Sequence, residues 1–224
     1  MFIGHFGVGF SCKAAAPRAS LGTYFLAAQF IDMLWPTFLL LGIEHARIQP
    51  GITTVTPLDF TDYPFSHSLA AVVVWGVLVG LIYQSIRHYP RGAVLIGLAV
   101  ISHWVLDLVV HRPDLPLYPG GGAKVGLDLW SSLGATLFVE FALLGAGVWL
   151  YARATRARDR IGRFGLWGLV AFLAVAYLAS VFGTPPPSIA AVAWIGQSGW
   201  LILIWAYWVD RHRIESGRVS VRTS

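Results

Sequence analysis

Three ionisable residues lie at four-residue intervals inside an apolar run. His103, Asp107 and His111 occupy the second half of segment 91–114, which is long enough to cross a bilayer. This spacing places them along one side of a helix at roughly 6 Å per step, so neighbours can share an ion or a proton but the outer two cannot. Because ionisable groups are costly at membrane depth and are kept there mostly for function, the segment is interpreted as one wall of a polar site.

The composition of the chain indicates an integral membrane protein. Of its 224 residues 56% are hydrophobic and only 12% are charged, too few charges to cover a water-soluble surface of this size. The single cysteine, Cys12, excludes an internal disulfide and a cysteine-based zinc site. The net charge of +5 could suggest a nucleic-acid partner, but in a membrane protein the placement of positive charge matters first.

The hydropathy pattern predicts an all-α polytopic membrane helix bundle, formed by residues 1–224 as one integral membrane domain. A short N-terminal helix or half-helix is expected in 1–12. Loops with turns are expected at 45–65 and in the Pro- and Gly-rich 112–127, and a tail at 210–224. The six full spans are predicted at Ser20–Glu44, Ser66–His88, Arg91–His111, Asp128–Tyr151, Phe164–Gly183 and Ile189–Val209.

Basic residues segregate strongly when they are assigned to alternating sides of these spans. Thirteen of the 16 Lys and Arg residues fall on one side, five of them in the loop from Arg153 to Arg163, whereas Arg47, Arg112 and Lys124 fall on the other. The positive-inside rule therefore predicts a bacterial-type cytoplasmic membrane protein with a cytoplasmic C-terminus. Because the arginine run is an ordinary topology signal, no nucleic-acid partner is expected.

The predicted topology places ionisable residues from separate segments at similar depths. At 1.5 Å per residue from the cytoplasmic side, His5 lies at roughly 12 Å, Asp32 and His103 at roughly 18 Å, and Asp107 at roughly 24 Å. His67 and His111 lie at roughly 30 Å, near the outer rim. The set predicts a polar cavity that opens outward.

Imidazoles and carboxylates in this combination suit a divalent metal ion. Zinc is the first expectation, and manganese or magnesium is an alternative. Such an ion lowers the pKa of a bound water and provides a nucleophile at neutral pH. The structural alternative is that each His or Asp pairs with a neighbouring helix. For Glu140, which is alone in its span, a proton-bearing or a paired structural carboxylate is the preferred interpretation, while His111 and Asp114 are interpreted equally well as interfacial residues.

Two motifs give the chain a resemblance to a known family. Ser66-His67-Ser68-Leu69 and Ser102-His103-x-x-x-Asp107, preceded by His5 and an acidic residue, resemble the pattern of the YdjM-like family of membrane-bound metal-dependent hydrolases. The likeness covers roughly residues 1–119, the predicted metal-site half, and leaves the three further spans in 128–209 without a chemical assignment. It implies second-layer donors at Ser66 and Ser102, and metal ligands at His5, Asp32, His67, His103 and Asp107.

The chain departs from that family pattern at two places. Asp32 lacks the Pro-Asp-x-Asp context, and Asp62-Tyr63-Pro64-Phe65 replaces the basic stretch before Ser66-His67. Two expected ligands are therefore missing. The chain binds one ion where relatives bind more, recruits Asp62, or has lost catalysis.

Four functions are compatible with these residues. The first is a hydrolase of a phosphoester or another lipid-linked substrate, in which Asp107 or Asp32 is the general base. Membrane lipid is the expected partner of such an enzyme. The second is a permease of small molecules or a proton-coupled carrier, in which Asp32, His103, Asp107 and Glu140 form a relay. A Ser/His hydrolase using Ser66, Ser68 or Ser102 is weakly supported, because Gly-x-Ser-x-Gly is absent. A non-catalytic membrane scaffold is the fourth.

Overall fold

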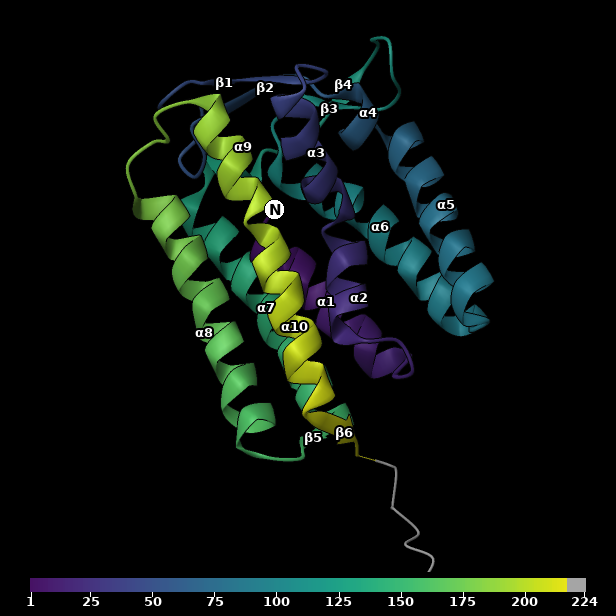
Figure 1. The fold of residues 1–224 in the computed structure, drawn as a ribbon. Helices are drawn as coiled ribbons and strands as arrows, with labels where there is room; N and C mark the ends of the chain where they lie inside the picture. The colour runs from purple at the N-terminus through teal and green to yellow at the C-terminus, as the bar shows by residue number, and fades with distance from the viewer. Residues whose placement is uncertain (217–224) are drawn as a thin grey trace, which may run out of the picture.

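The computed structural model describes residues 1–216 and shows a mostly helical bundle (Figure 1). Two very short helices, α4 (Pro64–His67) and the 3-10 helix η1 (Leu129–Ser131), join the longer ones. The longer helices are α1 (Ile3–Ala15), α2 (Leu21–Ala28), α3 (Phe30–Leu40), α5 (Leu69–Arg87), α6 (Pro90–Val110), α7 (Leu133–Ala154), α8 (Arg160–Phe182), α9 (Ile189–Gln197) and α10 (Gly199–Arg211).

Five helical segments are long and apolar enough to cross a membrane. They are α5, α6, α7, α8 and the nearly continuous pair α9 and α10, Ile189–Arg211. Large apolar side chains such as Leu81, Phe138 and Leu201 are exposed on their outer surfaces, as expected for surfaces that face lipid. The chain is therefore a multi-pass membrane protein.

The segment predicted as the first span, Ser20–Glu44, consists of two shorter helices. α2 and α3 meet at Gln29, whose backbone (φ −101°, ψ 6°) leaves the helical conformation. The Ala28 carbonyl beside this break accepts a hydrogen bond from Nδ1 of His103 at 2.8 Å. The interruption thus releases a backbone acceptor that a continuous helix would have used internally.

The predicted N-terminal helix is present as α1, and it lies inside the bundle. α1 begins near the middle level of the molecule and runs toward one end (Figure 1). It packs closely against α7, where Gly7 and Gly147 bring the two backbones into contact. The backbone N–H groups of Phe2 and Gly4 donate to Glu140 at 2.8 and 2.7 Å. Glu140 is thus a paired structural carboxylate at the positive end of a helix.

Three small antiparallel strand pairs cover the two ends of the bundle. β1 (His45–Ile48) pairs with β2 (Leu58–Asp62), and β3 (Leu115–Pro116) pairs with β4 (Lys124–Val125), at what we call the hairpin end. β5 (Thr155–Ala157) pairs with β6 (Arg213–Glu215) at the opposite end (Figure 1). The connection 45–65, predicted as a loop, therefore contains strands. Phe60 on β2 is buried and packs 5.3 Å from the ring of Trp35, which fixes this hairpin on the bundle.

The basic residues separate between these two ends as the sequence predicts. Arg87 and Arg91 lie where α5 ends and α6 begins, and the arginines of 153–163 extend from the end of α7 through β5 to the start of α8. We call this end of the bundle the basic end, while Arg47, Arg112 and Lys124 belong to the hairpin end. Of the predicted tail 210–224, residues 217–224, with two further arginines, lie outside the described residues.

The contact between α1 and α7 leads to a first prediction. A Cβ at Gly147 would collide with the backbone of Gly7, whereas a Cβ at Gly145 meets nothing within 4 Å. Gly147→Leu should therefore destabilise the fold by ~1–3 kcal/mol through overpacking, and Gly145→Leu should not. Thermal unfolding of both variants in detergent measures the difference. Equal stability of the two variants would contradict the close packing of α1.

Candidate metal centre

The five residues predicted as metal ligands come together from four helices. His5 lies on α1, Asp32 on α3, His67 on α4, and His103 and Asp107 on α6. Two groups of three, His5 with His103 and Asp107, and Asp32 with His67 and His103, each have ligand atoms within 4.8 Å of one another. Since both groups share His103, the five side chains form one cluster near the middle of the bundle.

The distances within the cluster are short enough for shared coordination. Nε2 of His103 lies 3.2 Å from Oδ2 of Asp107 and 3.5 Å from Oδ1 of Asp32. Nε2 of His67 lies 3.8 Å and 3.6 Å from the same two oxygens. Ligand atoms placed tetrahedrally around an ion at zinc-ligand distances are about 3.3 Å apart. The four nitrogen–oxygen distances are therefore compatible with that spacing, and Asp32, His67 and His103 form one of the two groups that could hold an ion.

His5 occupies the other side of the Asp107 carboxylate. Its Nε2 lies 3.2 Å from Oδ1 of Asp107, the oxygen that also accepts a hydrogen bond from the Met1 amino group at 2.6 Å. The His5 ring stacks on that of His103, with centroids 3.8 Å apart and an interplanar angle of 8°. His5 thus forms, with His103 and Asp107, the second group of side chains that could hold an ion.

Hydrogen bonds behind the imidazoles turn their inner nitrogens toward the carboxylates. Nδ1 of His103 donates to the Ala28 carbonyl, which can only accept, so Nδ1 carries a proton. Nδ1 of His67 lies 2.7 Å from the Ser66 hydroxyl, which donates to Glu44 at 2.6 Å. In neutral imidazoles held this way, Nε2 presents a lone pair. Lone pairs that face carboxylate oxygens require a proton or a cation between them.

The cluster is buried except at one side chain. His5, His67, His103 and Asp107 are at most 3% exposed, while the Asp32 side chain is 30% exposed. Within the described chain, Nε2 of His103 has no hydrogen-bond partner of good geometry despite its complete burial. A buried imidazole nitrogen that faces carboxylates without such a partner is available to coordinate a metal ion.

Several other residues considered from the sequence lie outside this cluster. Asp62 is exposed and its carboxylate is 3.7 Å from His45 at the hairpin end, so it is not recruited. The Ser102 hydroxyl donates to the Ala99 carbonyl instead of supporting a histidine. Ser68 caps α5 by accepting from the N–H of Ala71.

His111 and Asp114 form a separate buried pair above the cluster. Nδ1 of His111 lies 2.9 Å from Oδ1 of Asp114, which also accepts from the Tyr63 hydroxyl at 3.2 Å. Burial lowers the pKa of the His111 imidazole, although the hydrogen bond to Asp114 opposes this shift. Both side chains are mostly buried, so interfacial solvation does not describe them. His111 instead packs against the rings of Phe60 and Trp130.

Glu44 is a site residue that the sequence did not reveal. It is 1% exposed, and it accepts from the backbone N–H groups of Phe65 and Ser66 and from the Ser66 hydroxyl. These contacts position α4 and the His67 ring. Glu44 lies 22 residues before Ser66, at the end of an apolar run, and no motif connects the two. An acidic residue that ends an apolar segment was the only available signal.

No protein-family model, curated protein or solved structure matches this chain. The resemblance to the YdjM-like family therefore stays a prediction that depends on the two Ser-His motifs and their spacing.

The Glu44 contacts lead to a second prediction. Glu44→Ala leaves two backbone donors and the Ser66 hydroxyl without their acceptor in a buried position, and should reduce the free energy of unfolding by about 3 kcal/mol. Asp62→Ala at the exposed His45 pair is the matched control and should change it by less than about 0.5 kcal/mol. Thermal unfolding in detergent distinguishes them. Similar stability of both variants would contradict a supporting role for Glu44.

Proposed function

We propose that this chain is a membrane-embedded metal-dependent hydrolase. Its divalent ion, zinc in the first instance, would be held by His67, His103 and Asp107, which leaves a fourth position for water, with Asp32 and His5 beside it. The observation that carries this proposal is the orientation of His67 and His103. Outer hydrogen bonds fix their Nδ1 atoms, and both Nε2 atoms face the same two carboxylate oxygens at 3.2–3.8 Å.

The protein side chains have distinct roles in this proposal. A bound zinc ion supplies Lewis acidity and makes water nucleophilic near neutral pH. Oδ1 of Asp107 already accepts from the Met1 amino group and faces His5, so this carboxylate is suited to holding charge in place. Asp32 is the exposed carboxylate of the set, and it is therefore the better acceptor for a proton from an attacking water.

The location of the cluster supports a substrate associated with the membrane. α4, α3 and the second half of α6 carry four of the five residues, and these segments lie toward the hairpin end. With the basic end in the cytoplasm, the site opens outward, and α2 with α3 forms a sixth crossing. A phosphoester or another lipid-linked bond is the proposed substrate class. In this proposal the substrate reaches the site from the surrounding lipid bilayer.

The proton-coupled carrier is supported less well. Its relay would need Glu140 to exchange protons with the cluster. Glu140 instead accepts from the backbone of Phe2 and Gly4, which fix both of its oxygens. A carboxylate occupied in this way supports helix α1 and is poorly placed to shuttle protons.

Metal analysis and catalysis test the proposal together. Purified protein should contain about one transition-metal ion per chain, and His67→Ala or His103→Ala should remove most of it. His45→Ala, an exposed histidine at the hairpin end, is the matched control and should retain it. Asp32→Asn should lower the metal-dependent hydrolysis of phosphatidic acid or p-nitrophenyl phosphate by roughly 10²–10⁴-fold.

Two results would count against this function in different ways. An unchanged, substoichiometric metal content in the His67 and His103 variants would defeat the metal centre. Stoichiometric metal without chelator-sensitive hydrolysis of any phosphoester or lipid-linked substrate would leave a metal-binding protein and defeat the hydrolase.

A further inference from the structure

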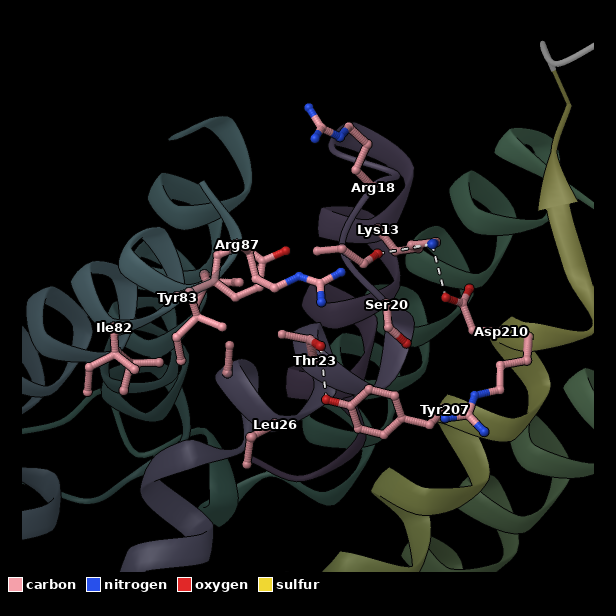
Figure 2. Close-up of a pocket in the computed structure, with 16 residues that line it drawn as sticks. Lys13, Arg18, Ser20, Thr23, Leu26, Ile82, Tyr83, Arg87, Tyr207 and Asp210 are labelled. Atoms are coloured by element: carbon pink, nitrogen blue, oxygen red, sulfur yellow. Dashed lines mark hydrogen bonds and ion pairs between the residues drawn. The ribbon is translucent and has the colours of Figure 1, made fainter. Parts of the chain in front are cut away.

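A large cleft opens at the basic end of the bundle, away from the His/Asp cluster. It has a volume of about 620 Å³ and lies between α2, α5 and α10. Figure 2 shows Arg87 reaching into the space between these helices. On the opposite side of the cleft, the hydroxyls of Thr23 on α2 and Tyr207 on α10 form a hydrogen bond of 2.9 Å. The cleft is therefore bordered by polar side chains near the ends of α5 and α10.

The rim of this cleft carries positive charge that the described chain does not neutralise. Arg18, Arg87 and Arg211 line the cleft, and none of them forms an ion pair with a carboxylate of residues 1–216. Arg18 rests on the ring of Tyr89 at 4.5 Å, which leaves the edge of its guanidinium available.

The one carboxylate in the cleft is already compensated. Asp210 binds Lys13 at 3.0 Å (Figure 2). It also accepts hydrogen bonds from the N–H of Leu21 and the hydroxyl of Tyr151, each at 3.1 Å. Its charge is thus matched by Lys13. The three arginines leave the cleft with a net positive charge.

Below this rim, the walls of the cleft are apolar. Leu26, Val79, Ile82, Ile86 and Ile96 line it, and Ile82 and Ile86 are exposed large hydrophobic residues of α5. Cationic groups at the rim and aliphatic walls beneath it match a ligand with an anionic head and a hydrocarbon body.

We propose that this cleft binds an anionic phospholipid, with the phosphodiester held by Arg87, which reaches between the helices, with Arg18 and Arg211 adding positive charge to the lining, and with an acyl chain along Ile82 and Ile86. Guanidinium groups match phosphate oxygens in geometry and charge. Basic pockets between transmembrane helices on the cytoplasmic side are suited to anionic lipid headgroups. The proposal is independent of the metal centre, because no ligand of that cluster lines the cleft.

Native mass spectrometry of the full chain, titrated with dioleoyl-phosphatidylglycerol or dioleoyl-phosphatidylcholine, tests the assignment. The wild-type protein should retain the anionic lipid at least about tenfold more strongly. The double variant Arg87→Gln with Arg211→Gln should lose that preference. Arg158→Gln with Arg160→Gln removes the same charge from exposed residues of the basic end outside the cleft, and should keep it.

Two further arms separate a lipid from a simple anion. Ile86→Gln should weaken retention of phosphatidylglycerol, and millimolar inorganic phosphate should not displace the lipid. Displacement by phosphate alone would assign the rim to a free anion and overturn the lipid proposal. Equal losses in the cleft and control double variants, or equal retention of both lipids, would also overturn it.

Discussion

The structure depends on the burial of one carboxylate in the middle of an apolar bundle. Asp107 is 2% exposed, and a carboxylate at that position is tolerated only if partners surround it. Its oxygens face the Met1 amino group and three imidazoles, from α1, α4 and α6. Asp107 therefore has these partners only when α1 lies inside the bundle and α4 places His67 beside the carboxylate.

The supporting contacts of the cluster follow from this requirement. The break between α2 and α3 releases the Ala28 carbonyl that orients His103. Glu44 holds Ser66, and Ser66 holds the ring of His67. Glu140 accepts from the first backbone donors of α1 and thereby fixes the helix that carries His5. The hydrogen bonds of these groups orient the histidine side chains, so that the Nε2 atoms of His67 and His103 face the carboxylates.

The sequence was informative where a local rule applied. Hydropathy predicted a multi-pass helical protein, and the i, i+4 spacing put His103 and Asp107 on one side of α6. Counting depth from the basic side brought His5, Asp32, His103 and Asp107 to neighbouring levels, and the structure places them together. The same count put His67 near the outer rim, whereas the structure places its imidazole beside Asp32 and Asp107. The break at Gln29, the strands in 45–65 and the role of Glu44 could not be predicted. Each depends on a contact between segments far apart in the chain, for which a single sequence carries no signal.

X-ray absorption at the zinc edge of the zinc-loaded protein tests the central claim most directly. Coordination by His67, His103, Asp107 and one water, with Asp32 beside them, predicts four nitrogen or oxygen ligands at about 2.0–2.1 Å, with back-scattering from two imidazole rings. A shell of about six oxygens without imidazole scattering would show zinc held elsewhere, and it would contradict a metal centre built around the buried carboxylate.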